Sequence, residues 1–261
     1  MRIVVCMKQV PETTEVKIDQ AQNRVDTGGL TRIINPYDTY ALEEAIRIKE
    51  NSGATVTVVS MGPDEVDQSL REALAMGADE AVRLSDPAFE GSDPLATAYI
   101  LARGIEKLGD YDLIICGRQA MDGSSGNVGP GVAEELGLPQ VTFVRKIEEL
   151  KEGYIRLQRM TDDGYEVLEG PLPMLITVVK EINEPRLASL KGLMKAKRVT
   201  IPVWGLSDLG ADPSRVGPSG SPTVVAKVAP PPPRSGGEII EGTPEEQVKT
   251  LVAKLKAQKV L

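Results

Sequence analysis

A glycine- and serine-rich run carries the clearest chemical signal in the sequence. It follows a strand-like stretch at 113–116 and leads to a helix that is expected to begin within 126–130. Glycines let backbone N–H groups approach an oxyanion, and the start of a helix presents unpaired donors and partial positive charge. Ser124 and Ser125 can add hydroxyl donors. The run therefore predicts a site for a nucleotide phosphate or pyrophosphate, unless its glycines serve only to join a strand to a helix.

The spacing of this run is neither G-x-G-x-x-G nor G-x-x-x-x-G-K-[ST], so it is neither the dinucleotide fingerprint nor a phosphate-cleaving P-loop. Ligands of open α/β sheets bind at the carboxyl ends of the strands. Three residues near such ends could line the same crevice, or could simply pack there: Cys6, Asn35 and Met61. Asp93 and Thr97 lie at another helix start and could reach a ligand ring or ribose. N-capping by Ser92 or Asp93 is the simpler explanation.

A basic stretch with interspersed apolar residues follows a strand-like run at 175–179. Its apolar members are Leu187, Leu190, Leu193 and Met194. Apolar residues on a basic segment suggest a surface that docks another protein. The alternative is a solvated helix whose leucines face the core.

Composition excludes several classes of protein. The chain has 261 residues and no histidine, so Ser–His and Cys–His nucleophile pairs and His-ligated zinc are excluded, and no metal site is expected. The net charge of −8 is spread along the chain without a basic block, which argues against nucleic acid as a partner. Cys6 and Cys116 lie in apolar runs and are expected to be buried thiols. No apolar window is long enough for a membrane span and no secretory signal is present, so we expect a cytoplasmic protein.

Short apolar runs alternate with helical periodicity, which predicts an α/β fold with a parallel sheet. The expected strands are 3–6, 56–60, 81–84, 113–116 and 175–179, and the expected helices begin at Pro36 and Asp64, span 94–108, and end before Gly137. Asn35 is the expected N-cap of the first helix. Alternating residues at 154–160 and 165–169 predict an added β-hairpin.

The last part of the sequence predicts a different organisation. We expect residues 1–205 to form the nucleotide-binding domain and residues 206–261 to form a Gly/Pro-rich linker and a C-terminal helix. The helix, at 245–259, has an apolar face that must bury itself on its own domain or on another subunit.

Five stretches together resemble the β subunit of electron-transferring flavoproteins: CMKQVPETTEVKID, INPYDTYALEEA, ALAMGADEA, GRQAMDG and VKEINEPRLASLKGLMKAK. The resemblance covers nearly the whole chain in order and spacing. It implies a fold related to the adenine nucleotide α-hydrolase group and an obligate heterodimer with an FAD-bearing α subunit, on which the C-terminal helix would pack. In the family's ordinary carriers the β subunit holds AMP, whereas in the electron-bifurcating branch the same pocket holds a second FAD that takes a hydride from NADH.

The resemblance also assigns residues to both sites. Those for the nucleotide are Cys6, Asn35, Pro36, Tyr37, Asp38, Met61, Gly117, Arg118, Gln119, Ala120, Met121, Asp122, Gly123, Ser124, Ser125, Gly126, Asn127 and Val128. Those for docking are Glu184, Pro185, Arg186, Leu190, Met194 and Lys195, with Leu190 as the apolar anchor that enters an acyl-CoA dehydrogenase. Arg118 is the candidate for positive charge near the flavin ring or phosphates, with a surface ion pair as the alternative.

Three stretches are similar to the bifurcating branch: VPETTEVKID, GSDPLAT and GSPTVV. We therefore expect FAD, with NADH as donor, a dehydrogenase or quinone pathway as high-potential acceptor, and ferredoxin or flavodoxin as low-potential acceptor. That branch usually shows DGDTAQVGP, where this chain has Asp122-Gly123-Ser124-Ser125-Gly126-Asn127. A conventional AMP-bound carrier is the alternative. A stand-alone nucleotide hydrolase is disfavoured because no Walker lysine follows the loop, and no catalytic residue is assigned.

Overall fold

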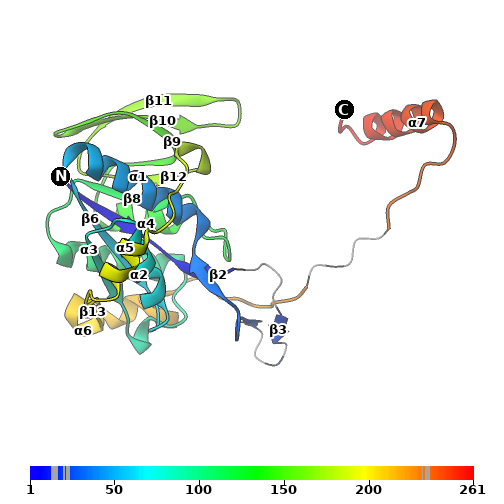
Figure 1. Cartoon of the computed structure of the whole chain (residues 1–261). Helices are drawn as coiled ribbons and strands as arrows, with labels where there is room; N and C mark the ends of the chain where they lie inside the picture. The colour runs from blue at the N-terminus through cyan, green and yellow to red at the C-terminus, as the bar shows by residue number, and fades with distance from the viewer. Residues whose placement is uncertain (13–16, 20, 22–23, 231, 233–235) are drawn as a thin grey trace. The chain divides into compact units, whose positions relative to one another are not determined.

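The computed structural model of the chain (Figure 1) describes residues 1–12, 17–19, 21, 24–230, 232 and 236–261. Part of the opening motif, 13–16, and part of the proline-rich run, 231 and 233–235, lie outside the described residues. Contacts divide the chain into two compact units. The first consists of residues 1–17 and 25–226, and the second of residues 18–24 and 227–261.

The described strands of the first unit form a nine-stranded sheet in the order β11-β10-β9-β12-β8-β1-β6-β7-β13. Every pairing from β9 to β13 is parallel, which confirms the predicted α/β class. The parallel strands are β1 (Arg2–Cys6), β6 (Thr55–Met61), β7 (Glu80–Leu84), β8 (Leu113–Gly117), β12 (Met174–Val178) and β13 (Val203–Trp204). Short sheets are also formed by β2 (Gln9–Pro11) with β5 (Arg32–Ile34), and by β3 (Lys17–Asp19) with β4 (Arg24–Asp26).

Helices cover both faces of this sheet because its central strands are apolar on both sides. Ile3 and Val5 of β1 belong to one hydrophobic cluster, and Val4 and Cys6 belong to the other, as the alternation of a strand requires. The first cluster includes α1 (Pro36–Ser52), α2 (Val66–Met76) and α5 (Leu190–Ala196). The second includes α3 (Pro94–Leu108), α4 (Val128–Glu135) and α6 (Leu206–Leu209). The sheet is therefore the middle of three layers.

The predicted hairpin is confirmed as β10 (Tyr154–Met160) and β11 (Tyr165–Pro171), paired antiparallel. The sequence did not predict β9 (Gln140–Lys151), which joins the hairpin to the parallel strands. Val144 is the one fully buried residue of β9, so the strand lacks the apolar run that marks the central strands. Figure 1 shows these three strands at one edge of the sheet.

The first unit extends to Ala226, beyond the expected domain boundary at 205. The reason is that Leu209, Ala211 and Val216 are buried in the second cluster, so the chain after β13 still contributes to the core. In the second unit, α7 (Pro244–Ala257) occupies the position of the predicted C-terminal helix. A reciprocal capping box of Thr243 and Glu246 starts it. Among the described residues, no helix is both long and apolar enough to cross a membrane.

Candidate functional site

Asp38, in the first turn of α1, joins three segments at the carboxyl end of the sheet. Its Oδ2 accepts a hydrogen bond of 2.7 Å from the backbone N–H of Lys8, just beyond β1. Its Oδ1 accepts a bond of 3.1 Å from the backbone N–H of Gly117, the last residue of β8. The side chain is buried, so these bonds replace the water that a carboxylate requires. The carboxyl group thus fixes where the glycine-rich loop leaves the sheet.

Burial raises the pKa of Asp38 to about 7. Hydrogen bonds from the Lys8 backbone, the Asn35 side chain and the Gly117 backbone oppose this rise because they favour the carboxylate. The carboxyl group therefore changes charge near neutral pH.

Gly117 is required by the close approach of α1. A Cβ atom at this position would lie 2.3 Å from Oδ1 of Asp38 and 2.6 Å from the backbone carbon of Tyr37. Both distances are well inside van der Waals contact, so a side chain would displace α1 or the loop.

Asn35 holds the loop in a second place. Its Nδ2 donates to the Gln119 carbonyl at 2.9 Å, and its Oδ1 accepts from the Met121 N–H at 3.0 Å. The residue is 1% exposed. Asn35 does occupy the N-cap position of α1, but its side chain makes no capping bond, and Pro36 follows at the first helical position. The predicted N-cap position is therefore confirmed, but the side-chain amide binds the loop instead of the helix N–H groups.

The rest of the loop turns back toward α4. The Ser124 N–H donates to the Ala120 carbonyl at 2.9 Å, and both Ser124 and Gly126 have positive φ, 48° and 65°. Asp122 forms an ion pair of 2.7 Å with Lys8. Ser125 accepts a weak bond of 3.5 Å from Asn127, whose own side chain makes no capping bond to α4. The N-terminal end of α4, which begins at Val128, therefore keeps N–H groups that a bound oxyanion can use.

Arg118 leaves one buried donor without a partner. Its guanidinium lies 4.9 Å from the centre of the Phe143 ring, and its Nε is buried with no hydrogen-bond acceptor. No ion pair of the described residues includes Arg118, so the alternative of a surface ion pair is not found. A buried and unpaired donor beside a glycine-rich loop fits an anionic ligand.

Two cysteines lie in the strands beneath the loop. Cys6 and Cys116 are free, buried and directly opposite each other on β1 and β8, as expected of buried thiols. A hydrogen bond with Cys6, together with burial, raises the pKa of the Cys116 thiol well above its ordinary value. Cys116 is therefore not a nucleophilic thiolate at neutral pH. Gly129 of α4 packs against this layer, since a Cβ there would lie 2.8 Å from Thr177 and 3.5 Å from Cys116.

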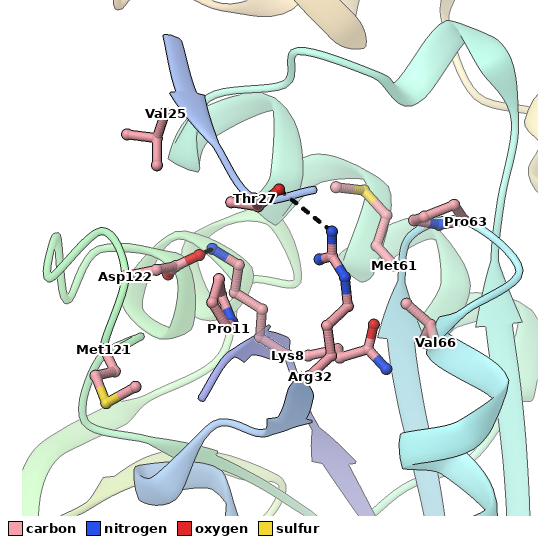
Figure 2. Close-up of a pocket in the computed structure, with 11 residues that line it drawn as sticks. Lys8, Pro11, Val25, Thr27, Arg32, Met61, Pro63, Val66, Met121 and Asp122 are labelled. Carbon is pink, nitrogen blue, oxygen red and sulfur yellow. Dashed lines mark hydrogen bonds and ion pairs between the residues drawn. The ribbon is translucent and has the colours of Figure 1, made fainter. Parts of the chain in front are cut away.

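A cavity of about 620 Å³ opens beside the loop and shares Met121 and Asp122 with it. The residues that line it are Lys8, Gln9, Pro11, Val25, Thr27, Arg32, Met61, Pro63, Val66, Met121 and Asp122. Figure 2 shows the Lys8 ammonium turned toward Asp122, and Arg32 bonded to the Thr27 hydroxyl, at 3.3 Å. Of these residues, the sequence singled out Met61, Met121 and Asp122. The others gave no local signal, although Lys8, Gln9 and Pro11 belong to the opening motif.

Comparison with known proteins now decides the family. The model of the electron transfer flavoprotein domain matches residues 23–209. The chain belongs to the electron transfer flavoprotein β-subunit family. It is 46% identical to the electron transfer flavoprotein subunit beta of Thermoanaerobacterium thermosaccharolyticum over 100% of both chains. It is also 46% identical to the caffeyl-CoA reductase-Etf complex subunit CarD of Acetobacterium woodii, over 100% of both. Identity with the protein FixA of Azotobacter vinelandii is 41%, over 99% of this chain and 95% of the relative.

In this flavoprotein subunit, Asp93 is not bonded to the loop. It caps α3, as the alternative held, by accepting from the N–H groups of Leu95 and Ala96 at 2.9 and 3.0 Å. Its other oxygen accepts from the Thr223 N–H at 3.0 Å, and its own N–H donates to Ser221. Thr97 follows in the first turn of α3 and is partly buried. The stretches GSDPLAT and GSPTVV, far apart in the sequence, are thus hydrogen-bonded to each other.

The apolar residues of the basic stretch are exposed. Leu187 is 93% exposed, Leu190 83% and Met194 65%. The alternative, in which these side chains face the core, is therefore wrong. Lys195 is exposed as well, whereas Arg186 is bonded to α1, as is the carbonyl of Glu184, next to Pro185.

Proposed function

We propose that this chain is the FAD-binding β subunit of an electron-bifurcating electron transfer flavoprotein, working in an obligate heterodimer with an α subunit. The observation that carries the proposal is the cavity of about 620 Å³ that continues from the glycine-rich loop. A loop alone would suffice for a phosphate. A mononucleotide bound at the loop does not need an additional cavity of this size. A flavin ring joined to the same phosphates does need one.

The residues fit FAD in two parts. The loop offers backbone N–H groups, the start of α4 and the unpaired Nε of Arg118 for the pyrophosphate. The cavity offers apolar walls from Pro11, Met61 and Val66 for a planar ring. Together these groups would hold the pyrophosphate in the middle of one dinucleotide and the flavin ring at one end of it.

The protein's part in the reaction is to bind, orient and tune. FAD, when bound, would supply the chemistry by accepting a hydride from NADH and delivering electrons singly. Asn35 and Asp38 keep the loop in place, and Arg32 puts positive charge in the cavity, whereas the charge of Lys8 is paired with that of Asp122. That charge would stabilise an anionic reduced ring, which is the role first expected of Arg118. No histidine is needed for these tasks.

The proposed partners follow from the family and from two surfaces. The exposed Leu190 would dock an acyl-CoA dehydrogenase or related flavin dehydrogenase as high-potential acceptor, with ferredoxin or flavodoxin as the low-potential acceptor. The relative from Acetobacterium woodii is, by its name, a subunit of a caffeyl-CoA reductase-Etf complex, which supports a reductase of CoA esters as partner. The C-terminal helix α7 would pack on the α subunit, and the complex would work in the cytoplasm.

The alternative is a conventional carrier in which the loop holds AMP and this chain takes no part in redox chemistry. The loop sequence SSGN, where bifurcating relatives usually have DTAQ, favours this alternative.

An anaerobic titration with NADH tests the proposal. The purified heterodimer should lose flavin absorbance on addition of NADH, and Arg32→Glu should weaken this response while Glu106→Gln, on α3, leaves it unchanged. A wild-type heterodimer that dithionite reduces but NADH does not would refute the bifurcating role and leave the AMP-bound carrier.

A further inference from the structure

The docking segment, residues 183–197, contacts helix α1 near its N-terminal end and helix α2 near its C-terminal end. At its N-terminal end, Asn183 donates from Nδ2 to the Tyr40 carbonyl and to Glu44, each at 3.0 Å. Arg47 donates to the Glu184 carbonyl at 3.0 Å. Tyr40, Glu44 and Arg47 all belong to α1. The segment therefore has a fixed base on that helix.

Arg186 makes the densest of these contacts. Its backbone N–H and Nε donate to Oε2 of Glu43 at 3.1 and 2.9 Å. Its two terminal nitrogens donate to Glu50 at 2.5 and 2.9 Å, and one of them also reaches Glu43 at 3.2 Å. Planar guanidinium groups that bind two carboxylates in this way fix geometry as well as charge. The hydrogen bonds from Arg186 lower the pKa of Glu50, so the ion pairs persist at neutral pH.

The C-terminal half of the segment rests on α2. A Cβ on Gly192 would lie 2.1 Å from the Ala75 carbonyl oxygen, so the two backbones are in direct contact. Arg71 donates to the carbonyls of Ala196 and Val199 at 2.8 and 2.9 Å, which satisfies the end of α5. The docking segment is thus attached to two helices, α1 and α2.

We propose that Arg186 is a positioning residue, which holds the docking segment on α1 so that Leu187 and Leu190 are presented in one conformation to the partner protein. The guanidinium is used within the chain, on Glu43 and Glu50, and does not itself bind the partner. This inference rests on the proposed docking role of the segment. A preformed apolar anchor binds more tightly because less conformational entropy is lost on association.

Hydrogen exchange tests the first half of this inference on the intact heterodimer. Arg186→Ala should increase exchange in 183–190 by about tenfold, since it removes charge-assisted hydrogen bonds that hold this stretch on α1. Glu50→Ala should act in the same direction and more weakly. The matched control is another exposed Arg–Glu pair, Arg103 with Glu106 on α3, whose alanine variants should leave exchange in 183–190 unchanged. Unchanged exchange in Arg186→Ala would overturn the inference.

Electron transfer to a purified acyl-CoA dehydrogenase tests the second half. Both Arg186→Ala and Glu50→Ala should raise KM for the dehydrogenase with kcat and nucleotide content unchanged, and the double variant should be no worse than Arg186→Ala alone. If Arg186 bound the partner directly, Glu50→Ala would leave KM unchanged, or the effects of the two substitutions on KM would add in the double variant. Either result overturns the inference. A wild-type heterodimer that transfers no electrons would refute the docking function itself, before any substitution is made.

Discussion

Asp38 and Glu43 are both buried carboxyl groups on α1, and each holds a different functional segment. Asp38 accepts from Gly117 at the start of the glycine-rich loop, and Glu43 accepts from Arg186 in the docking segment. One rigid helix therefore carries the proposed nucleotide site at its N-terminal end and the base of the proposed docking surface farther along. Substitutions at one end of α1 should affect nucleotide binding and substitutions at the other end should affect docking, since each end has its own hydrogen bonds.

Asn35→Ala should loosen the loop without unfolding the chain. The substitution leaves the Gln119 carbonyl and the Met121 N–H without partners, a cost of about 1–3 kcal/mol for each buried group that water does not reach. We expect about tenfold weaker nucleotide retention, measured by nucleotide content after dialysis of the heterodimer. The control is Asn51→Ala, at the exposed end of the same helix, which should retain nucleotide like the wild type. Equal nucleotide retention by the two variants would contradict the role of Asn35 in holding the loop.

Gly117→Ala should be strongly destabilising. Its Cβ would lie 2.3 Å from Asp38 and 2.6 Å from Tyr37, and relief of this clash requires movement of α1. We expect a loss of about 1–3 kcal/mol in the free energy of unfolding, as for overpacking in a core. Gly123→Ala, in the same loop, has no atom within 4 Å of its Cβ and should change stability little. Denaturant titrations of both variants test this prediction. Similar unfolding midpoints for Gly117→Ala and Gly123→Ala would show that the contact of α1 with β8 is not tight.

Asp38 should make stability fall as the pH rises. Its pKa is 3.8 in the unfolded chain and about 7 in the folded one. Between these values the unfolded chain has lost the proton that the folded chain keeps, so unfolding becomes easier by at most about 1.4 kcal/mol per pH unit. The stabilisation is complete below about pH 4 and is lost as the pH passes 7. Asp38→Asn should therefore be destabilised most at pH 5 and least at pH 8 relative to wild type. Thermal midpoints across that range test this, and a difference independent of pH would show that Asp38 does not titrate there.

Arg118→Ala should reduce FAD affinity by about tenfold, because it removes the buried and unpaired Nε donor beside the loop. Arg145→Ala is the matched control, since Arg145, on β9, also lies over an aromatic ring, that of Tyr165 on the added hairpin. Titration of FAD into the nucleotide-free heterodimer gives the two dissociation constants. Unchanged affinity and flavin potentials in Arg118→Ala would exclude a role for this side chain.

The parallel strands β1, β6, β7, β8 and β12 were predictable because they are apolar on both faces, whereas the two-residue strand β13 was not predicted. Helix α3 was predicted with its observed limits because Pro94 and Gly109 mark its ends. The loop was recognisable from glycines and serines that are adjacent in sequence. Strand β9 was not recognisable from the sequence, because Val144 is its only fully buried residue and the strand is held by pairing with strands on both sides.

The network around Asp38 could not be found from local patterns, since Lys8 and Gly117 come near it only when β1 and β8 pair. The same is true of Arg186, whose basic surroundings suggested a partner contact. Its carboxylate partners lie on α1, more than a hundred residues away in sequence.

Quantification of the nucleotides released from the denatured heterodimer tests the central proposal most directly. If the cavity beside the glycine-rich loop holds a flavin ring, the extract will contain two FAD per heterodimer and no AMP. One FAD and one AMP per heterodimer would contradict the proposal and assign this chain to the conventional carriers.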